Sequence, residues 1–173
     1  MATRRHAPTV MRIRRAVPAD AAEIWAIRTR AILHGCASHY PSGDLAAWAA
    51  RATPATCADA IATRHVVVAV RDDGGLAGFA QLDPQEGTVE AVYVDPDRAR
   101  QGVGRALLSA LEDAAARVGL RGLVVEASQN SVPFYGALGY AHECRAQHSL
   151  GGGHRIACAV MSKRLGDTPR TGR

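Results

Sequence analysis

The feature that most constrains this chain is a run over residues 92–108, in which an apolar strand leads through a basic loop and a glycine turn into a helix. Gly102 and Gly104 open that helix. Three arginines lie beside the glycines: Arg98, Arg100 and Arg105. The first amides of a helix have no partners within it, and the positive end of the helix dipole lies there. The run therefore predicts a binding seat for a phosphate or pyrophosphate.

The residues alone allow more than one use for this turn. Gly-x-Gly between a strand and a helix also occurs in dinucleotide-binding folds, and Glu126 ends the next strand, where those folds hold a ribose. That interpretation fits poorly, because Leu107 replaces the third glycine and residues 95–101 separate the strand from Gly102. A P-loop is excluded because no Gly-Lys-Ser/Thr follows. A third interpretation is structural, with small residues letting the helix pack closely on a sheet.

Hydrophobic periodicity predicts one mixed α/β domain. With 173 residues, 47% of them hydrophobic, the chain is long enough to bury a core and too short for a second ordinary domain. Strands are predicted near Ile13 and over residues 66–70, 76–82, 88–94, 123–127, 140–147 and 155–161. Helices are predicted from residue 21, around residues 45–48, from residue 54, from the glycine turn to Gly119, and over residues 131–139. We expect a disordered leader at 1–10, the domain at 11–165 and a tail at 166–173.

Two of the predicted strands, 88–94 and 123–127, are joined by the helix that follows the glycine turn. Such a connection makes them parallel neighbours with a right-handed crossover. Residues 20–62 are predicted to be helical and to precede the first long strand, which makes them a candidate lid over a substrate. Asp20 and Glu23 are expected to form a capping box at the start of this segment.

Charge and cysteine pattern exclude several function classes. The net charge is +5, but five arginines lie in residues 1–15, and the part of the chain between its basic ends is mildly acidic. Aromatic residues make up only 5% of the chain, so a nucleic-acid groove lined with stacking rings is not expected. No apolar run is long enough for a membrane span or a secretory signal, so we expect a cytoplasmic protein. The four cysteines lack the spacing of metal ligands, so no metal is expected.

Four motifs along the chain, read together, point to one family. They are Val94-Asp95-Pro96, Arg100-Gln101-Gly102-Val103-Gly104-Arg105-Ala106-Leu107-Leu108, Val132-Pro133-Phe134-Tyr135 and Leu138-Gly139-Tyr140. Over residues 12–164 the chain resembles the GNAT superfamily of acetyl-coenzyme A dependent N-acetyltransferases, of the small bacterial single-domain type. The resemblance implies an α/β GNAT fold: a central mixed, mostly antiparallel sheet with one splayed parallel strand pair and helices on both faces.

The resemblance also implies acetyl-CoA as the cosubstrate. Backbone amides of the glycine turn would bind its pyrophosphate, and the main chain of the preceding strand would hold the pantetheine arm. The coenzyme-binding residues implied are Val92, Tyr93, Val94, Arg100, Gln101, Gly102, Val103, Gly104, Arg105, Ser128, Asn130 and Phe134. Two positions depart from the family pattern: Ala99 replaces the usual Arg or Gln at the start of the loop, and Ser128 replaces a usual Asn. Ser128 and the displaced Asn130 are therefore alternatives for one contact.

An amine attacks a thioester only in its neutral form, so the site needs a base for the amine and an acid for the departing thiolate. The resemblance implies that Tyr135 is the acid. Glu90 is the candidate base, directly or through water, because strand alternation is expected to place it on the face of Val92 and Val94. A salt-bridged strand glutamate is an equally good interpretation of Glu90. Glu126 is the alternative base, or a residue that binds the acceptor amine.

His39 and Tyr40 lie in a break between predicted helices, where related proteins build the acceptor pocket, and we expect them to contact the substrate. The implied activity is transfer of an acetyl group from acetyl-CoA to a primary amine of a small molecule or peptide by direct attack. The alternative is a non-catalytic acyl-CoA-binding sensor module, in which Tyr135 and Glu90 would be dispensable. The identity of the amine and the formation of a homodimer stay open at this stage.

Overall fold

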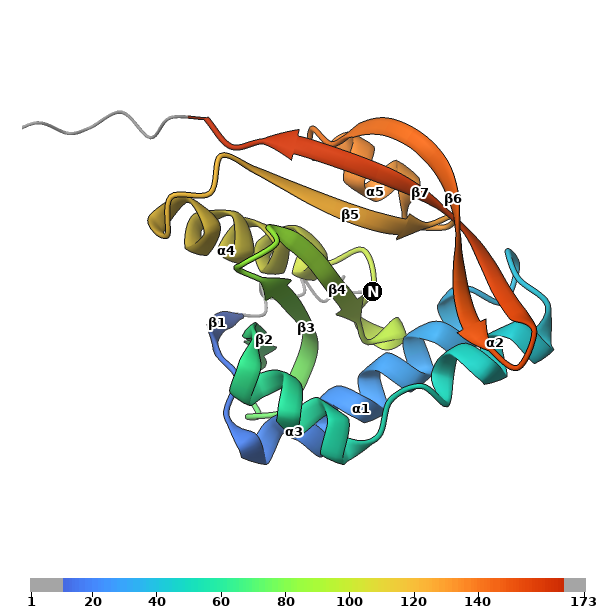
Figure 1. Ribbon diagram of the computed structural model, residues 1–173. Helices are drawn as coiled ribbons and strands as arrows, with labels where there is room; N and C mark the ends of the chain where they lie inside the picture. The colour runs from blue at the N-terminus through green and yellow to red at the C-terminus, as the bar shows by residue number, and fades with distance from the viewer. Residues whose placement is uncertain (1–10, 167–173) are drawn as a thin grey trace, which may run out of the picture.

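The computed structural model describes residues 11–166, and they form a seven-stranded sheet with helices against both of its faces (Figure 1). The strands are β1 (Arg12–Arg15), β2 (His65–Val70), β3 (Leu76–Asp83), β4 (Thr88–Val94), β5 (Gly122–Ser128), β6 (Ala141–Gly151) and β7 (His154–Arg164). The α-helices are α1 (Ala21–Arg30), α2 (Ser42–Ala49), α3 (Pro54–Thr63), α4 (Val103–Arg117) and α5 (Val132–Ala137). A π-helical turn, Ala31–Gly35, extends α1. The predicted leader and residues 167–173 of the predicted tail lie outside the described residues.

The strand order is β1-β2-β3-β4-β5-β7-β6, and every neighbouring pair is antiparallel except β4 and β5. Within residues 11–166 that parallel pair is joined only at Thr88 with Val124 and at Val89 with Val125. Beyond Val89 the two strands diverge, which leaves main-chain groups of β4 without a strand partner on that side. The predicted mixed sheet with one splayed parallel pair is therefore confirmed.

A β-bulge interrupts β4 at Glu90. Leu82 of β3 pairs with Val89, while its neighbour Gln81 pairs with Ala91, so Glu90 is the extra residue. The bulge changes which side chains of β4 share a face. Val89 belongs to the hydrophobic cluster on one face of the sheet, and Val92 packs against that same cluster. The Glu90 side chain is instead hydrogen-bonded to that of Gln81. Gln81 pairs with Ala91, which packs against the cluster on the other face of the sheet, so Glu90 lies on that other face. The prediction that Glu90 shares a face with Val92 and Val94 is wrong.

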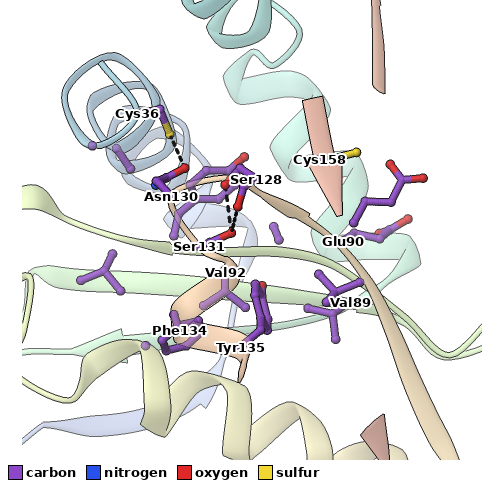
Figure 2. A pocket seen from close by; sticks show the side chains of 18 of the residues that line it. Cys36, Val89, Glu90, Val92, Ser128, Asn130, Ser131, Phe134, Tyr135 and Cys158 are labelled. Atoms are coloured by element: carbon purple, nitrogen blue, oxygen red, sulfur yellow. Dashed lines mark hydrogen bonds between the residues drawn. The ribbon is translucent and has the colours of Figure 1, made fainter. Parts of the chain in front are cut away.

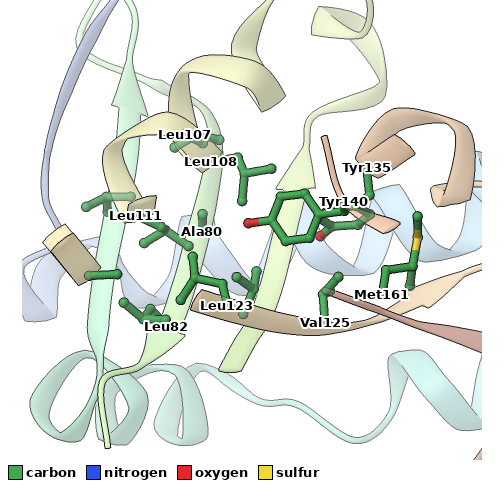
Figure 3. Packing of buried hydrophobic residues seen from close by; sticks show 14 of the residues in the cluster. Ala80, Leu82, Leu107, Leu108, Leu111, Leu123, Val125, Tyr135, Tyr140 and Met161 are labelled. Atoms are coloured by element: carbon green, nitrogen blue, oxygen red, sulfur yellow. The ribbon is translucent and has the colours of Figure 1, made fainter. Parts of the chain in front are cut away.

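Two cores lie on opposite faces of the sheet. On one face, leucines of α4 pack against β3, β4 and β5 (Figure 3). On the other face, α1 and α3 cover β2 and β3 with residues that include Ile24, Ile27 and Ile61. A third, smaller cluster joins α2 and the π-helical turn to the β6–β7 hairpin through Leu45, Leu150 and Ile156. This last contact brings residues far apart in the sequence to one end of the splayed strands.

The start of α1 differs from the predicted capping box. Asp20 makes no cap bond to the helix; its carboxylate accepts a hydrogen bond from the Val17 amide at 2.8 Å and pairs with Arg14 at 2.7 Å. Glu23 accepts a hydrogen bond from the amide of Leu76 at 2.7 Å, which ties α1 to the first residue of β3. Asp20 therefore fixes the chain just before the helix, and Glu23 makes a long-range contact that the local pattern could not reveal. No helix within residues 11–166 is long and apolar enough to cross a membrane.

Candidate functional site

A cavity of about 1280 Å³ opens where β4 and β5 diverge, between the start of α4, the start of α5 and the π-helical turn. Its lining includes eleven of the twelve residues predicted to bind the coenzyme: Val92, Tyr93, Val94, Arg100, Gly102, Val103, Gly104, Arg105, Ser128, Asn130 and Phe134. The exception is Gln101, which is exposed beside the turn. Glu90, Glu126 and Tyr135 also line this cavity. Residues predicted from separate motifs are thus brought together.

The two glycines of the turn serve different purposes. Gly102 has φ of +80°, in the left-handed region, and a Cβ built on it would meet nothing within 4 Å. A Cβ on Gly104 would lie 3.1 Å from Cε2 of Phe134, so this glycine permits close packing of α5 on the start of α4. The Ala106 amide makes the first intrahelical bond, to the carbonyl of Gly102 at 3.0 Å. The amides before it are free to face an anion at the open backbone of Gly102.

The loop ahead of α4 is held by Asp95. Its carboxylate pairs with Arg30 of α1 at 2.5 Å and accepts a hydrogen bond from the Asp97 amide at 3.1 Å. Burial opposes ionisation, but these contacts together hold the pKa of Asp95 below its usual value. Arg100 then adopts φ of +62°, which is uncommon outside glycine. Arg98, in contrast, does not line the cavity.

Tyr135 is 4% exposed and lies in the wall of the cavity, where Figure 2 shows its ring beside Val92. Its ring packs edge-on against Phe134, with the centroids 5.0 Å apart. Burial raises the pKa of the Tyr135 phenol well above its usual value, so the hydroxyl keeps its proton throughout the neutral range. The side chain can therefore act as a proton donor at this position.

The two alternatives for the missing family Asn both line the cavity, but they have different partners. The Oδ1 atom of Asn130 accepts a hydrogen bond from the Cys36 thiol at 3.4 Å (Figure 2). The Ser128 hydroxyl is 2.9 Å from that of Ser131, within the turn that starts α5. Asn130 thus connects the turn before α5 to Cys36, the residue that directly follows the π-helical turn.

Two cysteines, Cys36 and Cys158, line the cavity although neither belongs to a recognised motif. Burial raises the pKa of the Cys36 thiol to about 11, despite the hydrogen bond to Asn130. Burial also raises the pKa of Cys158. Both side chains are therefore protonated thiols near neutral pH, and thiols are poor nucleophiles. No group of three His, Cys, Asp or Glu residues suited to a metal ion occurs in the described part of the chain.

The two candidate bases both have side-chain partners, an arginine for Glu90 and a histidine ring for Glu126. The Glu90 carboxylate pairs with Arg64 at 3.1 Å and accepts from the side chain of Gln81. The Glu126 carboxylate lies 3.0 Å from Nδ1 of His148 on the β6–β7 hairpin. The pairing of Glu90 matches the salt-bridged interpretation, yet the residue also borders the cavity, so a role for it toward an amine stays a proposal.

Of the residues predicted to contact the acceptor, Glu126 lines the cavity, whereas His39 and Tyr40 do not. His39 is exposed, and its Nδ1 lies 3.0 Å from the hydroxyl of Ser38. Tyr40 is buried, and its hydroxyl donates to the carbonyl of Ala157 at 2.6 Å and accepts from the amide of Gln129 at 2.7 Å. Tyr40 therefore ties the helical segment to β7 and to the end of β5.

Replacing Tyr40 with phenylalanine is expected to lower the free energy of unfolding by about 1–3 kcal/mol, because two part-buried hydrogen bonds, to the Ala157 carbonyl and from the Gln129 amide, are lost. Urea denaturation of this variant, with the exposed neighbour variant His39→Ala as the control, measures the effect. Unchanged stability combined with weaker binding of the amine would restore the substrate role.

Several lining residues escaped sequence reasoning because they reach the cavity through long-range packing. They are Cys36, which directly follows the π-helical turn, Trp48 of α2, and Ile156 and Cys158 of β7. Trp48 stands at the junction of the clusters, with its ring centroid 6.0 Å from Tyr40 and 6.5 Å from Tyr93. Trp48 packs against the cluster that contains Leu45, three residues before it in α2, and this packing places the ring at the cavity wall.

The comparison with protein families decides the identity of this fold. The family described as acetyltransferase (GNAT) domain matches residues 36–152. The chain belongs to the GNAT acetyltransferase family. The resemblance seen in the motifs is thereby confirmed. A comparison with curated proteins gives no significant match.

Solved structures of GNAT proteins extend this result. A GCN5-related N-acetyltransferase from Rhodopseudomonas palustris is 31% identical, with a TM-score of 0.83 and coverage of 92% of this chain and 97% of that one. YncA from Salmonella typhimurium, solved with its cofactor acetyl-CoA, is 28% identical, with a TM-score of 0.64 and coverage of 92% and 96%. A phosphinothricin acetyltransferase from Sinorhizobium meliloti, in complex with acetyl-CoA, is 25% identical, with a TM-score of 0.66 and coverage of 94% and 92%.

Proposed function

We propose that this GNAT protein transfers an acetyl group from acetyl-CoA to a primary amine of a small molecule or peptide by direct attack. The observation that carries the proposal is the common cavity, which joins the free amides of α4, the unpaired part of β4 and the Tyr135 side chain. A thioester coenzyme requires a binding site for its pyrophosphate, a strand edge that hydrogen-bonds its extended arm, and a proton donor for its thiolate leaving group.

The residues present fit a CoA thioester. The backbone at Gly102 is open, and Arg100 and Arg105 line the same end of the cavity, which suits the negative pyrophosphate. Main-chain groups of β4 beyond Val89, including those of Val92 and Val94, lack a partner on β5 and can hydrogen-bond an extended amide-containing arm. Relatives with 25% and 28% identity were solved with acetyl-CoA, which supports the same cosubstrate here.

The chemistry then rests on two proton transfers. The neutral amine attacks the thioester carbonyl carbon and forms the amide C–N bond as the C–S bond breaks. Glu90, or water held by it, removes the proton of the attacking nitrogen, and Glu126 is the alternative base. Tyr135 donates its phenolic proton to the departing thiolate and regains a proton from solvent. No covalent enzyme intermediate is needed, which agrees with the protonated state of Cys36 and Cys158.

The helical segment over residues 20–62 remains the candidate acceptor side of the domain. The bulge supports this proposal, because it places Glu90 toward the face of β4 that α1 and α3 cover. The amine would reach the thioester from that face, while the coenzyme approaches from the start of α4.

Free thiol release from acetyl-CoA, measured across polyamines, amino acids, aminoglycosides and peptides, tests the proposal. We expect at least one class of amine to accelerate release well above the hydrolytic background. Coenzyme binding without turnover of any amine would instead favour the acyl-CoA-binding sensor module, the alternative that the same cavity would serve.

A further inference from the structure

A second, smaller cavity adjoins the first on the side of the helical segment. Its volume is about 280 Å³, equal to the liquid volume of about nine water molecules. The two cavities share five lining residues: Trp48, Glu90, Ala91, Tyr93 and His148. The rest of its wall comes mainly from α1, α3 and the strands beneath them, with apolar side chains such as Ile24, Cys57 and Phe79. A small group bound there would lie next to the proposed position of the thioester.

Arg28 of α1 lines this second cavity and is held in a fixed orientation. Its guanidinium donates to the carbonyls of Trp48 and Ala49, both at 3.2 Å, at the last turn of α2. The same group lies 5.8 Å from the ring centroid of Tyr93. These contacts use two of the five N–H donors, and within residues 11–166 Arg28 forms no ion pair.

Arg51, just after α2, is a second cation on the wall of this cavity. It donates to the carbonyl of Ser149 at 3.1 Å and, like Arg28, has no carboxylate partner in the described part of the chain. Arg64 behaves differently, since it pairs with Asp83 and Glu90. Within residues 11–166 the guanidinium groups of Arg28 and Arg51 thus have main-chain carbonyls and a tyrosine ring as partners, but no carboxylate. A carboxylate is the natural partner for guanidinium groups placed in this way.

We propose that the acceptor is an α-amino acid with a small apolar side chain, whose carboxylate binds Arg28 and Arg51. Its amino group would then face Glu90, at the wall that the two cavities share. This inference rests on the proposed function, because it names the amine that the same site acetylates. The volume, and the apolar part of the wall formed by Ile24, Cys57 and Phe79, suit a side chain such as that of leucine. A polyamine would instead bring a second ammonium group toward two unpaired guanidinium groups, which is unfavourable.

Three matched amines test the proposal: L-leucine, L-leucinamide and 3-methylbutylamine. All three have the same side chain, but the carboxylate of L-leucine is replaced by a neutral amide in L-leucinamide and is absent from 3-methylbutylamine. Thiol release at saturating acetyl-CoA gives kcat/KM for each amine with the wild type and with Arg28→Gln, Arg51→Gln and, as a control remote from the cavity, Arg121→Gln. We expect Arg28→Gln and Arg51→Gln each to reduce kcat/KM for L-leucine by about 10- to 150-fold, mainly by raising KM. This range corresponds to the loss of one charge-assisted hydrogen bond. Values for the other two amines, and all values for Arg121→Gln, should change by less than a few-fold.

Comparing ratios between wild type and variant cancels the different basicities of the three amines. The same ratio of L-leucine to L-leucinamide in wild type and in Arg51→Gln would overturn the proposal. This variant decides the question if Arg28→Gln fails to fold through loss of its bonds to α2, because Arg51 is exposed and its one side-chain hydrogen bond within residues 11–166 goes to the carbonyl of the exposed Ser149.

A binding measurement separates this inference from the proposed function. Calorimetric titration of L-leucine and L-leucinamide into the CoA-loaded protein needs no turnover. Binding of L-leucine but not of L-leucinamide, with that binding lost in Arg51→Gln, would support the carboxylate site. If the same protein acetylated no amine, only the proposed function would fail. Equal binding of both compounds would overturn the inference and leave acetyl transfer to other amines intact.

Discussion

Replacing Tyr135 with phenylalanine is expected to lower turnover by about 10²- to 10⁴-fold, the range attributed to positioned proton transfer, with little change in coenzyme affinity. The ring stays in place because the buried aromatic contacts with Phe134 and Tyr140 do not involve the hydroxyl. Only the proton for the departing thiolate is lost. Steady-state thiol release gives the rate, and calorimetric titration of CoA gives the affinity.

Tyr140 provides a matched control for this substitution. Its ring lies 5.4 Å from that of Tyr135 and is equally buried, yet it does not line the cavity. Tyr140→Phe should therefore keep its rate. Because burial raises the pKa of Tyr135, wild-type activity should also show no loss from Tyr135 deprotonation below about pH 10, the ordinary value for tyrosine. An unchanged rate for Tyr135→Phe would remove this residue from the mechanism.

Substituting leucine for Gly102 is expected to weaken coenzyme binding by about 100-fold or more. A side chain at this position would project into the open space in front of the α4 amides, and at least one or two charge-assisted hydrogen bonds to the pyrophosphate would be lost. Calorimetric titration of CoA into each variant measures the effect directly.

Backbone strain must be separated from the blocked approach. Gly74, in the turn between β2 and β3, has φ of +86° and an equally open surrounding, so Gly74→Leu introduces similar strain away from the cavity. This control should lose stability and keep its affinity for CoA. Equal affinity losses in both variants would show that strain, and not access to the Gly102 backbone, limits binding.

Much of the coenzyme side could be predicted from the sequence because its signals are local. A strand, a turn and a helix that follow one another directly fix the position of the α4 amides relative to β4. The purpose of each glycine could not be separated in this way. Gly104 meets the ring of Phe134, thirty positions further along the chain, whereas Gly102 is open, and only the packed structure distinguishes the two.

The acceptor side was harder to predict because it depends on register and on long-range packing. Simple alternation placed Glu90 with Val92, and one bulged residue reversed that assignment. Tyr40 looked available in a break between helices, yet its hydroxyl binds Ala157 and Gln129, which lie on distant parts of the chain. Arg28 carried no signal at all in a helix that reads as ordinary and amphipathic, because its partners belong to another helix.

A mass balance of a single turnover tests the central claim most directly. The protein is mixed with one equivalent of acetyl-CoA, with and without an amine that supports thiol release, and quenched samples are examined by mass spectrometry. Direct attack predicts one acetylated amine for every thiol released, no acetylated protein, and negligible release without the amine. Acetylated protein formed before the amine is added, or bound acetyl-CoA that stays intact with every amine tested, would contradict the account.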